Sequence, residues 1–304
     1  MQKIVIGNSD IKTGKLGLGT NKVGGHNLFS GLNDRAGADV ITTALDSGIQ
    51  MLDTAYMYGL GQSETIIGDV LRQYNRSDII LATKAAQDPD HDLTFNNDPE
   101  FLRRAVDQAL ERLKTDYIDI FYIHFPDDNT PKDKAVAALS ELKAQGKIRA
   151  IGLSNFTLDQ IKEANVNHDI DIVEDHYSLV HRDAEQSLWP YLKAHHITFV
   201  PYFPLAQGLL TGRYRQEDQP KFKQYPVAKY QHIMSALEDL KTIANQHAAT
   251  IAQVVLAWYM TNPDIGVVIP GARDAQQVQD NAKAALLTLT SDEYDDIDRL
   301  FQGF

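Results

Sequence analysis

The sequence predicts an α/β fold, a (β/α)8 TIM barrel with an N-terminal β-hairpin and extra C-terminal helices, and three observations support it. Eight short apolar segments alternate with stretches of helical periodicity, which is the element order of a parallel barrel. Several of these segments are nearly continuous in Ile, Val, Leu and Phe, as expected for strands that are covered on both faces. No composition shift or linker divides the 304 residues, so we expect one domain over residues 1–304.

The apolar segments are the predicted strands of the barrel. In chain order they cover residues 16–21, 50–53, 79–84, 118–124, 148–155, 170–174, 197–202 and 266–270. The predicted helices lie between and after them, where apolar residues recur at helical spacing. They cover residues 36–47, 64–74, 101–113, 135–145, 185–195, 230–246, 250–261 and 274–286.

Several helix starts are marked by capping residues. Asp98 and Thr130 each precede a proline, so each is predicted to cap a helix whose first residue is that proline. Thr157 and Thr250 each precede a glutamine by three residues, which is the spacing of a capping box.

Three segments are predicted to lie outside the barrel wall. Residues 3–12 read as a small hairpin whose turn is Asn8-Ser9-Asp10. The long polar stretch 206–228 is marked by Gly, Pro and Lys and is predicted to be a loop over one end of the barrel. The acidic stretch 291–300 is predicted to be a solvated C-terminal helix.

A doubly wound sheet would also alternate strands and helices. A dinucleotide-binding sheet should carry G-x-G-x-x-G after its first strand, with an acidic residue about 20 positions later. The nearest match begins with Gly17 and Gly19 and lacks the third glycine. The barrel is therefore the preferred fold.

Composition excludes several classes of function. Lys and Arg number 29 against 41 Asp and Glu, a net charge of −12, so we expect neither nucleic acid nor a membrane surface as a partner. The absence of cysteine excludes disulfides, thiolate catalysis and cysteine-ligated metals. None of the ten histidines pairs with another at helical i, i+4 spacing beside a carboxylate, so we expect no metal. The chain shows neither a membrane span nor a signal peptide, and a cytoplasmic location is expected.

Polar residues stand at the carboxyl ends of three consecutive predicted strands, where barrel enzymes hold their active sites. Asp53, Lys84 and His124 end these strands, and Tyr58 follows Asp53 closely. A buried lysine ammonium needs a carboxylate partner, which Asp53 can provide. The ammonium would stabilise the anion of the phenol and lower its pKa, so Tyr58 could donate a proton to a carbonyl oxygen. His124 could polarise the same oxygen, while the hydride must come from a cofactor.

These residues lie in a set of motifs that resembles the aldo-keto reductase superfamily. The motifs run in order through almost the whole chain: Leu52-Asp53-Thr54-Ala55-Tyr56-Met57-Tyr58-Gly59, the Lys84 strand end, Tyr122-Ile123-His124, Gly152-Leu153-Ser154-Asn155-Phe156, Tyr202-Phe203-Pro204-Leu205, Gly208-Leu209-Leu210-Thr211-Gly212, and Ile269-Pro270-Gly271-Ala272-Arg273 with Gln277 and Asn281. The resemblance implies a metal-independent oxidoreductase, of the alcohol dehydrogenase type, that reduces aldehydes and ketones with NADPH, with NAD also usable. Its partner would be a small carbonyl compound. The sequence leaves open which compound this is, and it also leaves open the oligomeric state of the protein.

The resemblance also implies site residues. Asp53, Tyr58, Lys84 and His124 would be catalytic, with Tyr58 as the general acid. Asn21, Met57, Tyr58, His124 and Phe125 would line the substrate pocket. The cofactor-binding residues would be Gly19, Thr20, Asp53, Ser154, Asn155, Glu174, Tyr202, Pro204, Leu205, Gln207, Gly208, Leu210, Arg213, Gly271, Arg273, Gln277 and Asn281.

The chain departs from the family pattern at two places. Glu174 stands where members usually carry a glutamine that bonds the nicotinamide carboxamide, and its charge is expected to favour the oxidised cofactor. At the adenosine end, Gly271 and Ala272 replace a lysine–serine pair, and Gln277 replaces an arginine. Arg273 is then the expected partner of a 2′-phosphate, through its planar fork of donors.

Two other functions stay open from the sequence. Lys84 could form a Schiff base in a barrel aldolase, although Asp53 opposes the neutral amine that this chemistry needs. The chain could instead be a cofactor-sensing regulatory subunit that docks on a channel protein with little turnover, as some members of the superfamily do.

Overall fold

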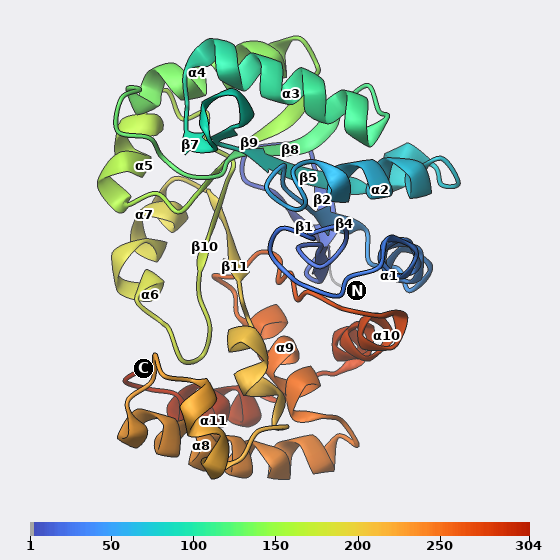
Figure 1. The fold of residues 1–304 in the computed structure, drawn as a ribbon. Helices are drawn as coiled ribbons and strands as arrows, with labels where there is room; N and C mark the ends of the chain where they lie inside the picture. Colours follow the sequence, from blue (N-terminus) through green and yellow to red (C-terminus); the bar gives the residue numbers. More distant parts are fainter. Residues whose placement is uncertain (1–2) are drawn as a thin grey trace.

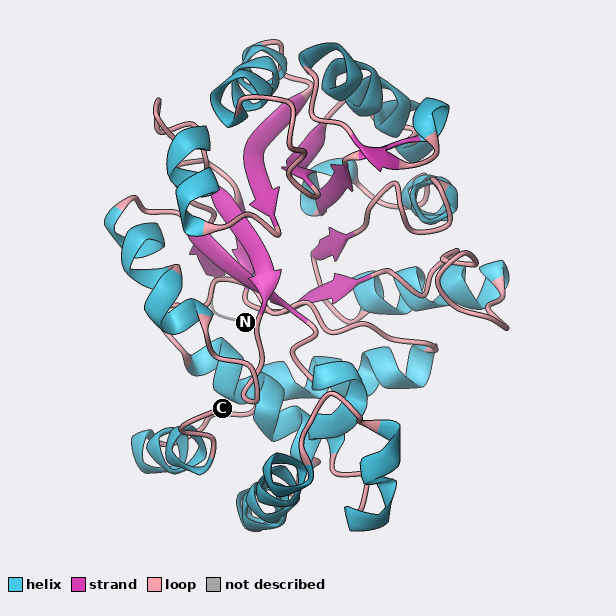
Figure 2. Cartoon of the chain, turned by 60° about the vertical axis from the view of Figure 1, so that its left-hand side comes forward, coloured by secondary structure: helices cyan, strands magenta, loops and turns pink. Residues whose placement is uncertain are grey.

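The protein, described for residues 3–304 by a computed structural model, has the predicted barrel (Figure 1). Within those residues, seven parallel strands form one sheet in the order β3-β4-β5-β8-β9-β10-β11. Figure 2 shows the strands curving around a centre, with helices on the outside. Because neighbours in this sheet follow the order of the chain, the sheet is a barrel wall and not a doubly wound sheet.

The elements have the following bounds. The strands are β1 (Lys3–Val5), β2 (Lys12–Gly14), β3 (Gly17–Gly19), β4 (Met51–Asp53), β5 (Ile80–Ala85), β6 (Gln87–Asp88), β7 (Thr94–Phe95), β8 (Ile118–Ile123), β9 (Ile148–Ser154), β10 (Ile172–His176) and β11 (Thr198–Tyr202). The α-helices are α1 (Asp34–Asp46), α2 (Gln62–Leu71), α3 (Pro99–Leu113), α4 (Lys132–Ala144), α5 (Leu158–Ala164), α6 (Ala184–Ser187), α7 (Trp189–Ala194), α8 (Val227–Gln246), α9 (Ile251–Thr261), α10 (Ala275–Lys283) and α11 (Ser291–Leu300). The 3₁₀ helices are η1 (Arg76–Asp78), η2 (Pro89–His91), η3 (Ala206–Thr211), η4 (Gln216–Lys221) and η5 (Ala284–Leu286).

The eighth predicted strand closes the barrel without forming a regular ladder. Gly17 N donates to Val268 O at 2.9 Å on one side, and Gly266 N donates to Phe199 O at 2.8 Å on the other. Pro270 lies within this segment and has no N–H to donate. The segment 266–270 therefore joins β11 to β3 through scattered bonds and isolated bridges.

The barrel interior explains why polar groups gather at one end. Its apolar layer is Ile6, Ile11, Met51, Ile80, Ala82, Ile120, Tyr122, Ala150, Ile172, Val200, Val267 and Ile269. Side chains two positions apart on a strand point to the same face. The residues that follow Met51, Ala82, Tyr122, Ile172 and Val200 by two are therefore directed into the same interior, nearer the carboxyl end. Those residues are Asp53, Lys84, His124, Glu174 and Tyr202.

The predicted hairpin closes the opposite end of the barrel. β1 and β2 pair antiparallel, with Val5 opposite Lys12. In the turn, Ser9 N donates to Ile6 O at 3.0 Å, and the Ser9 hydroxyl donates to the same oxygen. Ile6 and Ile11 are fully buried and belong to the interior layer. The hairpin therefore supplies the bottom of the core.

Most helix predictions are confirmed, and one cap is wrong. Asp98 caps α3, and Thr157 and Thr250 form capping boxes at α5 and α9. Thr130 does not cap α4, because its hydroxyl donates to Asp127 Oδ2 at 2.7 Å. The helix begins at Lys132, whose backbone N–H donates to Glu163 Oε1 at 2.8 Å.

Other differences are local. The predicted helix 185–195 is two short helices, α6 and α7, that meet at Leu188, because a proline follows at the second position of α7. The stretch 206–228 is a loop that contains η3 and η4. A hairpin of β6 and β7, which the sequence analysis did not predict, follows β5. In the described part of the chain, every helix is too short or too polar to span a bilayer.

Replacing Ile6 tests the closure of the barrel bottom. We expect Ile6→Ala to lower the free energy of unfolding by about 2–5 kcal/mol, because it leaves a cavity in the interior layer. Val5→Ala is the matched control, since Val5 is 48% exposed and should change the free energy by less than about 0.5 kcal/mol. Urea unfolding followed by circular dichroism measures both. Equal effects of the two variants would contradict a hairpin that forms part of the core.

Candidate active site

A buried lysine stands at the centre of the polar cluster. Lys84, at the end of β5, pairs with Asp53 Oδ1 and donates to Thr54 O at 3.1 Å. Its Nζ also lies 3.2 Å from Glu174 Oε2. All three ionisable side chains are buried. A buried ammonium persists only with such partners, so the structure places the expected Asp53 beside Lys84 and adds Glu174 as a second acid.

Tyr58 and His124 flank this lysine. The Tyr58 ring centre lies 5.7 Å from Lys84 Nζ and 6.3 Å from the His124 ring, which meets it edge-on. The turn after Tyr58 needs Gly59, which has φ +72°, and a Cβ there would lie 1.9 Å from Gly24 O. The four residues predicted to be catalytic therefore converge at the carboxyl ends of β4, β5 and β8.

Burial and charge set the protonation of these groups. Burial opposes the charge of Lys84, but Asp53 and Glu174 outweigh it, so the pKa of Lys84 is raised. Burial raises the pKa of the Tyr58 phenol, and Lys84 only partly opposes that shift. Burial, with Lys84 nearby, holds the pKa of His124 well below its usual value. At neutral pH the site therefore holds a charged lysine, a protonated phenol and a neutral imidazole.

The expectation of a net lowering of the Tyr58 pKa is wrong, because the pKa is raised in this structure. Burial is the largest cause and disfavours the phenolate; the Lys84 ammonium favours it but is opposed by Asp53 and Glu174 as well. Asp53 is the carboxylate that the sequence predicts beside Lys84, and the structure adds Glu174.

Glu174 differs from an ordinary glutamate. Burial and the neighbouring Asp53 carboxylate raise the pKa of Glu174 to about 8, although Lys84 opposes the shift. Its position in β10 sets it opposite Ser154 on β9 and Val200 on β11. The residue therefore stands in the barrel wall between the strands that end in Ser154 and Tyr202.

A second polar cluster lies beside the first. Asn155 has a left-handed backbone, with φ +62°, and its amide donates to His124 O and to Ser154 Oγ, both at 3.0 Å. The Tyr202 hydroxyl donates to Asn155 Oδ1 at 2.9 Å. The predicted nicotinamide-binding residues Ser154, Asn155 and Tyr202 are thus one bonded group next to His124.

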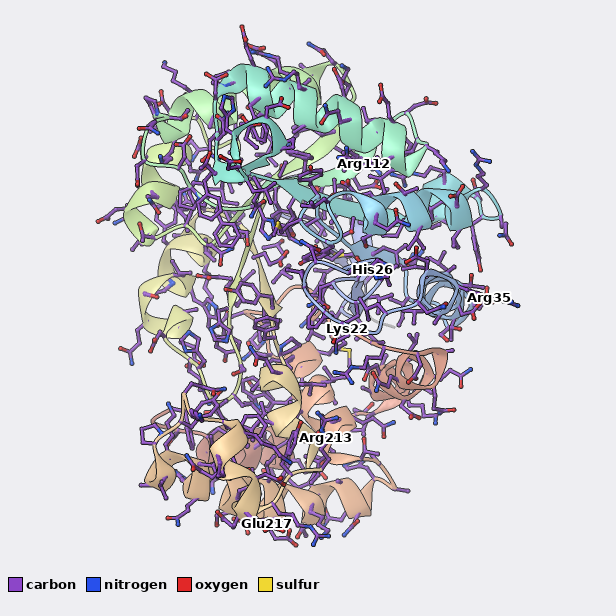
Figure 3. All side chains as sticks on the ribbon, in the orientation of Figure 1. Lys22, His26, Arg35, Arg112, Arg213 and Glu217 are labelled. Carbon is purple, nitrogen blue, oxygen red and sulfur yellow. The ribbon has the colours of Figure 1, made fainter. Side chains whose placement is uncertain are left out.

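Three cations come together from distant parts of the chain. The positive charges of Arg273 and Arg213, together with burial as the larger cause, lower the pKa of Lys22. Figure 3 labels Lys22 and Arg213, which lie in the loops after β3 and β11. The Arg213 guanidinium also packs against Gly208, where φ is +95°. The sequence analysis predicted Arg213 and Arg273 but assigned Lys22 no cofactor role, because its loop position carries no motif.

The remaining residues predicted at the cofactor site lie at the end of β3, in the segment before α10 and in α10. Asn21 Oδ1 would lie 3.3 Å from a Cβ on Gly271, and Gly19 is bridged to Gly271. Thr20 is buried, and its hydroxyl donates to Asp53 O at 2.9 Å. Gln277 Oε1 accepts from Arg273 N at 2.9 Å. Asn281 lies one turn further along α10.

The loop after β11 has an unusual backbone. Ala206, Gln207 and Gly208 are consecutive left-handed residues, a conformation that costs free energy at the two non-glycine positions. Leu205 is half-buried and Gln207 is exposed. Leu210 is fully buried in the core, so the structure does not place its side chain at the surface of this loop. The Pro204 carbonyl oxygen accepts a hydrogen bond from the Tyr259 hydroxyl at 2.7 Å.

Two residues that contact the loops of the site are not among the predicted site residues. Asn27 braces the Tyr58 loop on both sides, donating to Met57 O at 3.0 Å and accepting from Gly59 N at 2.8 Å. Phe95, on the β6–β7 hairpin, stacks on Phe125 at 4.8 Å, and Phe125 in turn packs beside His124. No motif marks either residue, since both act through contacts with distant segments.

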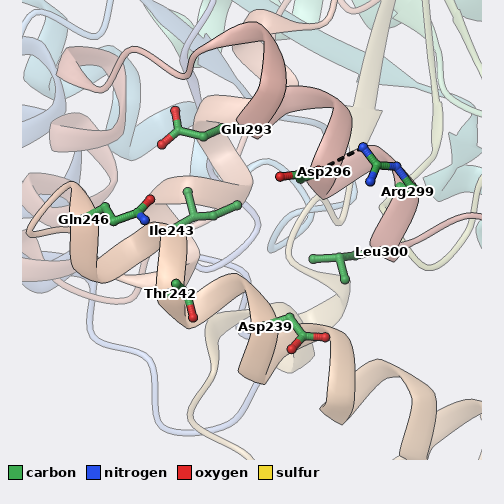
Figure 4. Close-up of a pocket in the computed structure, with 8 residues that line it drawn as sticks. All are labelled: Asp239, Thr242, Ile243, Gln246, Glu293, Asp296, Arg299 and Leu300. Carbon is green, nitrogen blue, oxygen red and sulfur yellow. Dashed lines mark hydrogen bonds and ion pairs between the residues drawn. The ribbon is translucent and has the colours of Figure 1, made fainter.

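A separate pocket lies between α8 and α11, away from the strand ends (Figure 4). Its lining residues are Asp239, Thr242, Ile243, Gln246, Glu293, Asp296, Arg299 and Leu300. Arg299 pairs with Asp296 at 2.9 Å. Among residues 3–304, no group of three or more His, Asp or Glu side chains could hold a metal ion.

Similarity to known proteins extends over almost the whole chain. The model of the aldo/keto reductase family matches residues 15–302. An aldo-keto reductase of Bacillus subtilis, YhdN, is 31% identical over a 316-residue alignment that covers 100% of this chain and 94% of the relative. The NADH-specific methylglyoxal reductase of Escherichia coli is 34% identical over 310 residues, 95% of each protein. The structure of the glycerol dehydrogenase AKR11B4 from Gluconobacter oxydans matches with a TM-score of 0.86 at 29% identity, covering 98% of this chain and 94% of that one.

The raised pKa of Glu174 makes stability depend on pH. Its folded pKa of about 8 lies above the value of 4.5 for an unperturbed glutamate, so its contribution is fully present below about pH 4.5 and is lost as pH rises to about 8. Between pH 5 and 8, the unfolding free energy of the wild type should fall relative to Glu174→Gln by a few kcal/mol, about 1.4 per pKa unit. Urea unfolding at several pH values measures this difference.

The control is Glu238→Gln, since Glu238 is an exposed glutamate on α8. Its difference from the wild type should change little over this pH range. A difference between wild type and Glu174→Gln that stays constant from pH 5 to 8 would contradict the raised pKa.

Proposed function

The chain belongs to the aldo/keto reductase family, and from this premise we propose that it reduces aldehydes or ketones to alcohols with a reduced nicotinamide cofactor, NADPH in preference to NADH. The observation that carries the proposal is the convergence of Tyr58 and His124 around the Lys84–Asp53 pair. These groups provide a proton donor and a neutral hydrogen-bond donor, but no electrons. A nicotinamide cofactor supplies the hydride when it is bound.

The residues at the barrel mouth fit such a cofactor. Lys22, Arg213 and Arg273 concentrate positive charge in a protein whose net charge is −12, which suits an anionic pyrophosphate or phosphate. The left-handed backbone at Gly208 brings the main chain close to the Arg213 guanidinium. Ser154, Asn155 and Tyr202 provide amide, hydroxyl and aromatic groups for the nicotinamide.

The chain's own residues then perform the proton transfer. Tyr58 donates its phenolic proton to the carbonyl oxygen as negative charge develops there. The neutral His124 ring donates a hydrogen bond to the same oxygen and orients it. The positive charge of the nearby Lys84 ammonium stabilises the phenolate that remains. Asp53 keeps Lys84 charged and in place. Alcohol oxidation uses the same groups in reverse.

The preference for NADPH rests on Arg273. The arginine is exposed and stands at the start of the segment leading into α10, and its guanidinium can contact a 2′-phosphate with two parallel bonds. Lys22 and Arg213 add charge nearby. The relative from Escherichia coli is NADH-specific, so family membership alone does not select the cofactor, and we infer that both cofactors bind.

The substrate side of the site is apolar. Met57, Phe125 and Phe95 lie near Tyr58 and His124. Apolar and aromatic walls with few polar groups are typical of sites for small organic ligands. We infer a small carbonyl compound whose substituents are largely apolar.

The two other functions have less support. A Schiff base needs a neutral lysine, whereas the carboxylates around Lys84 raise its pKa. The relatives described above are named reductases or a dehydrogenase, and nothing in them favours a channel-associated subunit.

Tyr58→Phe tests the proton donor. We expect kcat/KM for aldehyde reduction to fall by about 10²–10⁴-fold, because the general acid is removed, while Kd for NADPH stays nearly unchanged. Oxidation of NADPH at 340 nm across a panel of carbonyl compounds measures the rate. The control is Tyr56→Phe, since the Tyr56 ring packs against Arg112. Equal activity of the two variants would show that Tyr58 is not the acid.

Arg273→Ala tests the cofactor preference. Losing a charge-assisted hydrogen bond should weaken NADPH binding by about 10–100-fold, and NADH binding by much less. Fluorescence titration gives both values of Kd. Arg299→Ala, on α11, is the control and should change neither. If Arg273→Ala weakens both cofactors equally, the arginine does not recognise the 2′-phosphate.

A further inference from the structure

The polar centre of the barrel holds unequal charge. The Lys84 ammonium contacts two carboxyl groups, on Asp53 and Glu174. With all three ionised, this group would carry one net negative charge. The exposed fractions are 0% for Asp53, 1% for Lys84 and 3% for Glu174. An uncompensated charge at such depth is costly, and a buried acid commonly binds a proton instead.

The contacts of the two carboxyl groups indicate which of them binds that proton. Asp53 Oδ2 and Glu174 Oε2 are buried and have no hydrogen-bond partner within residues 3–304. Asp53 is the closer partner of Lys84, because its Oδ1 accepts a hydrogen bond from Nζ, whereas Glu174 Oε2 lies 3.2 Å away. Glu174 is thus the acid that gains less from the ammonium. Burial raises the pKa of both acids, so it is the closer contact of Asp53 with Lys84 that assigns the proton to Glu174.

The groups that face Glu174 come from four other strands or their loops. They are Asp53 and Tyr58 from β4 and its loop, Lys84 from β5, Tyr122 from β8 and Tyr202 from β11. Asp175 and His176 follow it on β10 itself, and His124 lies near Lys84. Burial raises the pKa of each of the three phenols above its usual range. Asp53 and Glu174 are therefore the pair that shares the surplus charge near neutral pH.

We propose that Glu174 is a charge-regulating residue of the cofactor site, which holds a proton when the bound nicotinamide is reduced and uncharged, and releases it when the nicotinamide is oxidised and cationic. This inference rests on the proposed function. Glu174 stands opposite Ser154 in the sheet, and its other neighbouring strand ends in Tyr202, so it lies between the residues proposed to hold the nicotinamide. A glutamine there could not change its charge.

The proposal predicts a pH dependence that separates the two forms of the cofactor. The oxidised form binds best to the ionised site, so its affinity rises with pH until Glu174 is ionised in the free protein and is constant above that point. The reduced form has no such requirement. The ratio of the two affinities should therefore rise by up to tenfold per pH unit between pH 6 and 8, because one proton is linked to binding.

The experiment is isothermal titration of the full-length protein with NADP⁺ and with NADPH at pH 6, 7, 8 and 9. Each titration is repeated in two buffers of different ionisation enthalpy, which counts the protons released. The two cofactor forms carry identical phosphates, so phosphate titration cancels in the ratio of affinities. Wild type, Glu174→Gln and the surface control Glu238→Gln are compared.

In the wild type and in Glu238→Gln, NADP⁺ should release up to one proton at pH 7, and NADPH close to none. In Glu174→Gln, the proton release should disappear and the affinity ratio should become nearly independent of pH. A wild type that releases no proton with NADP⁺ would overturn the inference without reference to any variant. A Glu174→Gln protein that keeps the wild-type slope would also overturn it.

Failure of the proposed function has a different signature. If neither NADP⁺ nor NADPH binds the wild type, and NAD⁺ and NADH do not bind either, the chain is not a nicotinamide-dependent enzyme. If both forms bind with a ratio that is flat with pH, the proposed function stands and only the role of Glu174 is refuted.

Discussion

An ammonium group in a dry barrel interior is the constraint on which this site depends. Lys84 lies near the end of β5, a strand that also supplies two residues of the interior layer of the barrel, and its side chain is buried. Its charge persists because carboxylates from β4 and β10 lie against it. Burial is the main reason that Tyr58 stays protonated, and those carboxylates add to its effect. Proton donor, counter-ion and charge regulator are therefore parts of one electrostatic unit.

The barrel makes this unit possible through the period of its strands. Apolar residues fill the layer nearer the hairpin, and polar residues occupy the next positions on the same strands. A packed layer below excludes water, which strengthens electrostatic interactions above it. The same layer makes each buried polar group expensive, so the site has little tolerance for an unpaired charge. This cost applies at Glu174, because the single Lys84 ammonium lies beside two carboxyl groups, those of Asp53 and Glu174.

Binding and chemistry are divided between the strand ends and the loops. The strand ends hold the groups that move a proton, and their positions are set by the sheet. The loops after β3 and β11 and the segment before α10 bring Lys22, Arg213 and Arg273 together. Three cations in proximity repel one another, and this repulsion is relieved when an anion lies between them. In the proposed complex, the phosphates of the cofactor would lie near the three cations of the loops. Its nicotinamide would lie near Glu174.

The sequence by itself determined the barrel, seven of its eight strands, most helices and their caps, and the convergence of Asp53, Tyr58, Lys84 and His124. It could do so because strand alternation and capping are local patterns, and because consecutive barrel strands are neighbours. Only the tertiary structure decided the properties that depend on distant contacts. The eighth segment closes the barrel through isolated bridges and not through a regular ladder. The Thr130 hydroxyl donates to Asp127 and does not cap α4. Glu174 reaches Lys84 across 90 positions of the chain. Burial, with Asp53 and this second acid, reverses the predicted shift in the pKa of Tyr58. Asn27, Lys22 and Phe95 likewise have no local signature, since their roles arise from the segments against which they pack.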